Sequence, residues 1–310
     1  MNERLTDFIT QHRAEIERAL RTHLPTSSHA GAERLNDALA YALFPGGKRL
    51  RPLLALSAAR LAGATHKQGI LVGCAVEFLH SSSLILDDLP AMDDADLRRN
   101  RRALHLVHGE GLAVLAAVAL LNQAYALLTR AAGACVGGST TEALLGEAAR
   151  AVGADGMIGG QVIDLELPPD TVSERTLASR DLKTVALMRL MMVAGALARG
   201  ADEETVATLA AFGECFGRAY QICDDLSDEL DASALSGKNA RQDARHLRPS
   251  AVSMLGMDAS QSLAVALVRE GASLLAGKFG ERNDARVLVE AAQLMLRKVK
   301  LADAEQLSVA

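Results

Sequence analysis

Apolar residues recur at intervals of three and four along most of the chain, which is the period of a helix with one buried face. Short stretches rich in Gly, Pro and Ser interrupt the pattern. Between these breaks the pattern predicts about ten helices with short connections. Their expected ranges are 2–22, 30–43, 50–63, 67–90, 112–131, 141–152, 173–198, 202–228, 259–278 and 283–308.

The composition supports helices over strands. Hydrophobic residues make up 49% of the 310 positions, but aromatic residues only 3%, and there is no tryptophan. Alanine and leucine favour helix, whereas strands favour aromatic and β-branched residues. We therefore expect an all-α fold: one domain over residues 1–310, an antiparallel helical bundle around a central cavity.

Charge and hydropathy narrow the functional classes. A net charge of −5 argues against nucleic-acid binding, which requires a basic surface. The apolar segment 112–128 contains Asn122 and Gln123 and falls short of the ~20 apolar residues of a membrane span. The charged N-terminal segment does not have the pattern of a signal peptide. We expect a cytoplasmic protein without stable membrane insertion, with 112–128 buried in the bundle or at a subunit interface.

A first group of aspartates follows the apolar run 84–86. Asp87 and Asp88 come directly after it, and Asp93 lies six positions beyond Asp87. That spacing places the two side chains on different faces of a straight helix. Pro90 is expected to break the helix and let the chain turn Asp93 back towards Asp87.

A second group follows the apolar run 219–223. Asp224 and Asp228 are four apart and share a helix face, with Asp225 beside them. Both groups are expected to lie near the ends of largely buried helices. Crowded carboxylates repel one another unless a cation neutralises them, and Mg²⁺ prefers oxygen ligands and substrate phosphates. If the two groups face one another across a cavity, they would hold a diphosphate through such ions. The alternative for each group taken alone is that its aspartates cap a helix or lie on a solvated face.

Basic residues supply the matching charge. Lys48 and Arg51 follow the Gly46-Gly47 turn at the start of an apolar helix, where backbone amides and fixed cations form an anion site. The alternative is ordinary soluble surface. The chain has no phosphate-binding P-loop, dinucleotide fingerprint or nucleophile elbow. This inventory favours metal-assisted diphosphate chemistry.

The order of these motifs resembles that of the trans-isoprenyl diphosphate synthases, and the resemblance covers most of the chain. It rests on Gly46-Gly-Lys-Arg-Leu-Arg-Pro52, Ala75-Val-Glu-Phe-Leu-His80, Asp87-Asp-Leu-Pro-Ala-Met-Asp93 with Leu97-Arg-Arg99, Gly156-Met-Ile-Gly-Gly-Gln161 with Asp164, Lys183-Thr184, and Tyr220-Gln221 with Asp224-Asp225-Leu-Ser-Asp228. Within this family, the apolar segment 112–121 together with Ser83-Leu-Ile-Leu-Asp-Asp88 looks like the bacterial geranylgeranyl diphosphate synthases.

The resemblance implies a role for each matching residue. The metal ligands would be Asp87, Asp88, Asp93 and Asp224, supported by Asp225 and Asp228. The allylic diphosphate would be held by Arg98, Lys183 and Lys238, with Thr184 and Gln221 lining that site. Isopentenyl diphosphate would be held by Gly47, Lys48, Arg51, His80 and Arg99. It also implies about three Mg²⁺ ions per site, replaceable by Mn²⁺, and a homodimer.

The implied reaction begins with ionisation of the allylic diphosphate, after which isopentenyl diphosphate attacks the allylic carbon. Product length is expected to depend on Ser82 and Ser83, five and four residues before Asp87. Relatives that stop at C15 carry a bulky aromatic side chain at one of these two positions. Two small residues predict geranylgeranyl diphosphate (C20). Alternatives are a C15 or C25 product, a terpene cyclase, or a non-catalytic regulatory subunit.

Three segments depart from the family pattern. Asn100-Arg-Arg-Ala-Leu-His105 stands where the family has Gly-x-Pro-Thr-x-His, Val185 replaces a glycine, and Leu247-Arg248 replaces Gly-Lys. These differences affect the loops expected to contact substrate rather than the metal ligands.

Overall fold

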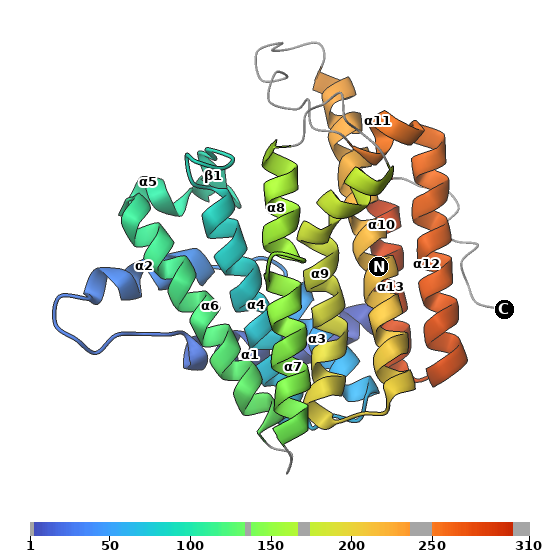
Figure 1. Ribbon diagram of the computed structural model, residues 1–310, viewed down its shortest axis with the longest axis horizontal. Coiled ribbons are helices and arrows are strands. Elements are labelled where there is room, and N and C mark those ends of the chain that lie inside the picture. Colours follow the sequence, from blue (N-terminus) through green and yellow to red (C-terminus); the bar gives the residue numbers. More distant parts are fainter. Residues whose placement is uncertain (1–2, 134–137, 167–173, 236–249, 300–310) are drawn as a thin grey trace. The chain divides into compact units, whose positions relative to one another are not determined.

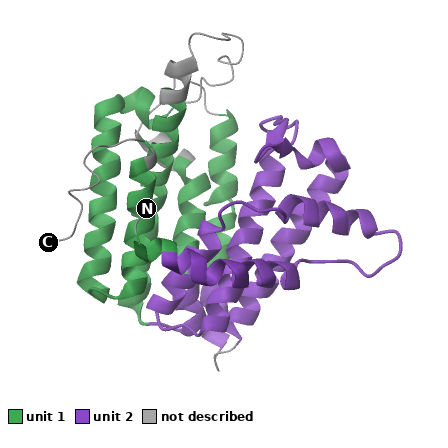
Figure 2. Cartoon of the chain, turned by 180° about the vertical axis from the view of Figure 1, so that it is seen from behind, with its two compact units in different colours: residues 1–6, 147–193, 202–310 green, residues 7–146, 194–201 purple. Residues whose placement is uncertain are grey.

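The computed structural model describes residues 3–133, 138–166, 174–235 and 250–299. These residues fold almost entirely into α-helices, and their only sheet is the hairpin of β1 (Leu97–Arg98) and β2 (Arg101–Arg102). The all-α prediction is confirmed. The chain divides into two compact units, coloured separately in Figure 2, so the prediction of a single domain stays a prediction.

The first unit described comprises residues 7–146 and 194–201, which Figure 2 labels unit 2. In it, α4 packs against both α3 and α6, as Figure 1 shows. A capping box starts α4: Thr65 Oγ1 accepts from the Gln68 amide, and Gln68 Oε1 accepts from the Thr65 amide. The elements are α1 (Glu3–His23, from Asp7 on), α2 (Glu33–Leu43), α3 (Leu50–Leu61), α4 (His66–Asp87), the hairpin, α5 (Leu104–His108), α6 (Glu110–Ala132) and the first part of α7 (Gly138–Val152).

The second unit comprises residues 1–6, 147–193 and 202–310. Glycines allow its helices to approach closely: a Cβ at Gly217 would lie 2.9 Å from the Val185 Cα, and one at Gly160 only 2.3 Å from the Lys183 amide nitrogen. The elements are α8 (Met157–Glu166), α9 (Glu174–Arg199, up to Val193), α10 (Glu203–Leu235), α11 (Ala251–Leu255), α12 (Met257–Phe279) and α13 (Asn283–Lys298).

Most predicted helices begin and end within a few residues of the observed ones, but three helices and the hairpin were missed. The missed helix α8 contains Gly159 and Gly160, whose low helix propensity weakens the signal. Its apolar residues Ile158, Val162 and Leu165 nevertheless have helical spacing. Helices α5 and α11 have five residues each, too few for a period to emerge.

Two described helices, α4 and α6, are long and apolar enough by composition to cross a membrane. In α4, 78% of the relevant window is buried inside the protein, as in the core helix of a globular domain. In α6 only 39% is buried. The exposed part of α6 includes Val114, Leu115 and Val118.

Candidate active site

The first acidic group lies where the backbone leaves α4. The helix ends at Asp87, and Asp88 is its C-cap. The chain then turns back, so that the Asp93 amide donates to the Asp87 carbonyl (2.9 Å) and the Ala95 amide to the Asp88 carbonyl (3.2 Å). The predicted turn after Pro90 is confirmed. It brings the backbones of Asp87 and Asp93 together, with Asp87 buried and Asp93 half-buried.

Asp88 is bound to an arginine of the hairpin. Arg98 Nε donates to both carboxylate oxygens of Asp88, at 2.9 and 3.2 Å, and Arg98 Nη2 also donates to Asp88. These hydrogen bonds raise the pKa of Arg98. Because Asp88 is 97% buried beneath this fork, its carboxylate orients Arg98, whose own side chain is 40% exposed.

The hairpin explains how Asn100 can stand where the family has glycine. Leu97 pairs with Arg102 and Arg98 with Arg101, which leaves Arg99 and Asn100 as a two-residue loop. Both loop residues have positive φ, 53° and 60°. Such loops require the left-handed region at both positions, and asparagine tolerates it better than other residues with a side chain. The substitution therefore preserves the turn that presents Arg98 and Arg99.

A buried arginine organises the Gly46–Arg51 segment. Arg49 Nε donates to Glu17 of α1 at 2.8 Å, Arg49 Nη1 donates to Glu77 of α4, and Arg49 Nη2 donates to the Leu43 carbonyl at 2.6 Å. Gly46 must be glycine because a Cβ there would lie 1.9 Å from the Arg49 guanidinium carbon. Sequence reasoning did not single out Arg49. Glu77, one turn before His80, is the signal that could have found it.

The predicted isopentenyl diphosphate residues gather positive charge beside this network. Arg51 Nη1 lies 3.2 Å from His80 Nε2, and a Cβ at Gly47 would contact the Arg99 guanidinium at 3.5 Å. Burial lowers the pKa of His80 well below its usual value, and Arg51 and Arg99 lower it further. His80 is therefore neutral and accepts a hydrogen bond from Arg51. It is neither a cation nor a base poised near neutral pH.

Arg99 shows the same crowding. Burial lowers its pKa, Glu77 opposes this, and the neighbouring guanidinium groups of Arg49, Arg51 and Arg98 lower it further. Cations held together in this way favour binding of an anion, which relieves their repulsion. Lys48 is exposed at the same turn.

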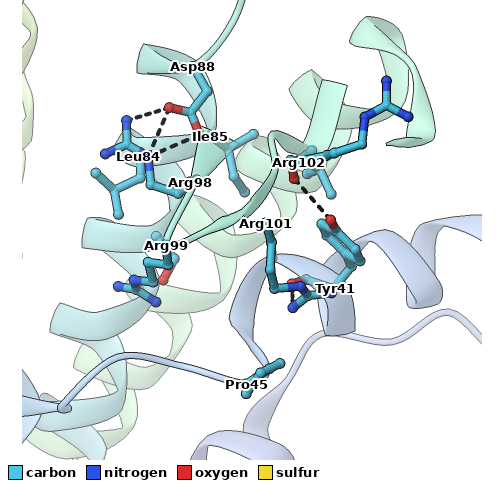
Figure 3. A pocket seen from close by; sticks show the side chains of 12 residues that line it. Tyr41, Pro45, Leu84, Ile85, Asp88, Arg98, Arg99, Arg101 and Arg102 are labelled. Carbon is cyan, nitrogen blue, oxygen red and sulfur yellow. Dashed lines mark hydrogen bonds and ion pairs between the residues drawn. The ribbon is translucent and has the colours of Figure 1, made fainter. Parts of the chain in front are cut away.

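A small pocket of about 50 Å³ lies between α2, α4 and the hairpin (Figure 3). In Figure 3, Arg98 points towards Asp88, whereas Arg101 lies against Tyr41. The residues that line the pocket are Tyr41, Ala42, Pro45, Ser81, Leu84, Ile85, Asp88, Arg98, Arg99, Arg101, Arg102 and Leu104.

The second acidic group lies within a helix, which corrects one prediction. The expected end of the helix near residue 228 is wrong, because α10 continues to Leu235. Asp224 and Asp228 are both exposed, one helical turn apart. Asp225 is buried and accepts from Gln221 Nε2 (3.1 Å) and the Ala251 amide (2.9 Å).

A polar chain extends from Asp225 to α9. Thr184 Oγ1 donates to Gln221 Oε1 at 3.0 Å, and Lys183 Nζ lies 3.7 Å from buried Asp164 of α8. The structure thus brings Thr184 and Gln221 together, as predicted for two residues that line the same site. Val185, which replaces the family's glycine, is buried against Gly217. Lys238 and the departure at 247–248 lie outside the described residues.

The two serines expected to control product length have different surroundings. Ser82 is buried and donates to the Ala117 carbonyl of α6 at 2.9 Å. Ser83 is half-buried and donates to the His80 carbonyl of its own helix at 3.0 Å. A larger side chain at Ser82 must displace α6, whereas one at Ser83 need not.

Among the described residues, His12, Glu15 and His66 are the only His, Cys, Asp or Glu residues whose potential ligand atoms form a group of three within 4.8 Å. Arg60 Nη1 lies 3.1 Å from His12 Nε2, and arginine can only donate. His12 therefore carries its proton on Nδ1, 3.7 Å from Glu15, so that nitrogen offers no lone pair to a metal. The described aspartates do not form a group of three at this distance.

Comparison with known proteins identifies the family. The polyprenyl synthetase family model matches residues 32–275. The farnesyl diphosphate synthase of Bacillus subtilis is 36% identical over 89% of this chain and 93% of its own. Geranylgeranyl pyrophosphate synthase 12, chloroplastic, of Arabidopsis thaliana is 38% identical over 78% of this chain and 69% of its own.

Solved structures agree. An apo structure of an FPP/GFPP synthase from Zymomonas mobilis has a TM-score of 0.82 and 31% identity, covering 96% of this chain and all of that one. Farnesyl and geranylgeranyl diphosphate synthases are about equally similar to this chain, so the comparison does not determine the length of the product. Prenyl synthases of this kind use divalent metal ions. The chain belongs to the polyprenyl synthetase family of trans-isoprenyl diphosphate synthases and is a trans-prenyltransferase.

Proposed function

We propose that this prenyltransferase is Mg²⁺-dependent and extends an allylic diphosphate with isopentenyl diphosphate to geranylgeranyl diphosphate. The observation that carries the proposal is the turn after α4. It brings the Asp93 backbone onto that of Asp87, while the adjacent hairpin presents Arg98 and Arg99. Acidic and basic groups thus lie within one continuous segment, as binding of a metal–diphosphate requires.

The residues fit the implied metal. Asp87 and Asp93 in one unit, and Asp224 and Asp228 in the other, offer the carboxylate oxygens that Mg²⁺ prefers. Asp88 and Asp225 act differently, since Arg98 and the start of α11 occupy their oxygens. Bound Mg²⁺ would stabilise negative charge on the departing diphosphate.

The chain's own cations complete the chemistry. Arg98, fixed by Asp88, binds the allylic diphosphate and stabilises charge as the C–O bond ionises. Lys183, which lies 3.7 Å from Asp164, is proposed as a further ligand of the allylic diphosphate. Thr184 and Gln221 line this site. Lys48, Arg51 and Arg99 hold isopentenyl diphosphate next to Gly47, and neutral His80 orients Arg51. Mn²⁺ is expected to substitute for Mg²⁺, because both prefer oxygen ligands.

The C20 product is proposed from the small side chain at Ser83. The test combines labelled isopentenyl diphosphate, C5, C10 or C15 allylic primers and Mg²⁺, and sizes the dephosphorylated products by mass spectrometry. A C20 alcohol that disappears with EDTA supports the proposal. A C15 alcohol as the final product would refute the product assignment and leave the chemistry standing.

Two variants test the role of Ser83. Ser83→Phe should shorten the product to C15 while isopentenyl diphosphate is still consumed. Ser82→Phe should lower the melting temperature, because its side chain must enter the packed contact with α6. An unchanged product length in Ser83→Phe would contradict this account.

We also propose that a second copy of the chain covers the exposed side of α6. Val114, Leu115 and Val118 are 39%, 59% and 52% exposed there, and Leu106 and Val107 of α5 are exposed as well. Light scattering should show a dimer that Leu115→Glu converts to monomer. Leu255→Glu, at an exposed leucine of α11, is the control. A monomeric wild type refutes the proposal.

A further inference from the structure

Arg101 belongs to the departure Asn100–His105, and the site described above gives it no task. Its guanidinium reaches back to the C-terminal end of α2. Arg101 Nη1 donates to the Phe44 carbonyl at 2.8 Å and to the Tyr41 carbonyl at 3.3 Å. Its guanidinium carbon also lies 3.8 Å from the centre of the Tyr41 ring.

The end of α2 provides an acceptor site for such a cation. The last carbonyls of a helix lack partners within it, and the helix dipole is negative there. The last turn of α2 contains no basic residue of its own. Arg101 therefore supplies this charge from the hairpin, and Arg49 supplies a second guanidinium at the Leu43 carbonyl.

A further hydrogen bond joins the end of α2 to the hairpin. Tyr41 Oη donates to the Arg102 carbonyl at 2.9 Å, so α2 and β2 are joined in both directions (Figure 3). Arg101 pairs with Arg98 across the hairpin, and the two-residue loop between them begins with Arg99. On the other side, Phe44 leads directly to Gly46, Gly47 and Lys48.

Arg101 thus connects the two segments that supply isopentenyl diphosphate residues. Arg98 has an independent anchor in Asp88, whereas the placement of Arg99 near Gly47 depends on how the hairpin meets the α2 end. We propose that Arg101 is a positioning residue that clamps the hairpin to the end of α2 and so holds Arg99 and Lys48 at the spacing that isopentenyl diphosphate needs. This rests on the proposed function.

The test compares Arg101→Met, Arg101→Lys and the matched control Arg102→Met, which removes the same charge from the adjacent exposed residue. Arg101→Met should raise KM for isopentenyl diphosphate about tenfold, because charged hydrogen bonds that fix the site are lost. KM for the allylic substrate and kcat should change by less than about threefold, since Arg98 keeps its anchor. Arg101→Lys should fall between Arg101→Met and wild type, since it keeps the charge without the fork. Arg102→Met should resemble wild type.

Equal rises in both KM values, or no difference between Arg101→Met and Arg102→Met, would overturn the proposal. If Arg101→Met does not fold, Tyr41→Phe removes only the hydrogen bond to the Arg102 carbonyl. It should raise KM for isopentenyl diphosphate alone, by about twofold. An unchanged KM there also overturns it.

Hydrogen exchange gives a readout that needs no turnover. In Arg101→Met, amides of residues 46–49 and 97–102 should exchange faster than in Arg102→Met, and a lack of difference would overturn the clamp. A wild type that consumes no isopentenyl diphosphate with any primer would refute the proposed function, and the exchange result would still decide whether Arg101 joins the two segments.

Discussion

The two acidic groups are made of the same residue type but are held in different ways. At Asp87–Asp93 the helix has ended, and backbone hydrogen bonds return the chain on itself. At Asp224–Asp228 the helix continues, and its regular turn alone places two carboxylates on one face. Each group contains a buried aspartate that accepts hydrogen bonds from the protein: Asp88 from Arg98, and Asp225 from Gln221 and Ala251. The comparison shows that Asp88 and Asp225 help to hold the local structure around each acidic group.

The largest effect is expected at Asp87. Asp87→Asn should lower kcat by about 10²–10³, the usual cost of losing a group that stabilises charge in the transition state. Asp94→Asn is the control, because Asp94 is exposed and has a φ of 48°, which asparagine tolerates. The measurement is steady-state turnover at saturating Mg²⁺. Equal activity of both variants would remove Asp87 from the site.

The second prediction separates neighbours within α10. Asp225→Ala leaves the Gln221 amide and the start of α11 without their acceptor, so it should cost about 1–3 kcal/mol of unfolding free energy. Asp224→Ala should lose activity with little change in stability, since Asp224 is exposed. Urea denaturation and turnover, measured on both variants, test this. The opposite pattern would reverse the roles assigned to the pair.

A third prediction concerns the packing that supports the second group. Gly217→Ala places a Cβ 2.9 Å from the Val185 Cα and should cost about 1–3 kcal/mol, because the backbone cannot yield as a flexible side chain would. Gly146→Ala, in α7 with nothing within 4 Å, should instead stabilise by about 0.5–1 kcal/mol. Thermal unfolding of both variants would show whether the close approach of two helix backbones decides if an added methyl group destabilises or stabilises the protein.

The hairpin offers a smaller test of the first group. Asn100→Ala should cost about 1 kcal/mol, because a Cβ-bearing residue without a short polar side chain is disfavoured at positive φ. Asn100→Gly should be neutral or slightly stabilising. If both variants match wild type in thermal unfolding, the two-residue loop does not limit stability.

The smallest effect should come from pH. His80 is held neutral in the folded protein, so the unfolded chain binds an extra proton below the ordinary histidine pKa of about 6.5. This contribution to stability is complete above that pH and is lost as the pH falls through it. Between pH of about 7.5 and about 5.5, wild type should therefore lose more unfolding free energy than His80→Gln. Parallel curves would mean that His80 does not titrate on unfolding.

The sequence was sufficient for the helical fold because a 3.6-residue apolar period reports burial directly. It also located both acidic groups and the turn after Pro90, since chain order and proline chemistry are local properties. It could not assign Asp88 to Arg98 or Ser82 to the Ala117 carbonyl, because such pairings depend on which helices meet. The extension of α10 beyond Asp228 was missed because four acidic residues in 224–229 resemble the end of an apolar run.

The buried position of Arg49 bears on where the functional chain begins. The family match starts at residue 32, which invites expression of a shortened protein without α1. Such a protein would lack Glu17 and leave a fully buried guanidinium with Glu77 and the Leu43 carbonyl but without its second carboxylate. Losing the hydrogen bonds from this buried charged group to Glu17 is expected to cost about 1.5–3 kcal/mol, a sizeable part of a domain's stability. The first helix thus supports the segment that we propose binds isopentenyl diphosphate, and a boundary drawn from sequence similarity would remove that support.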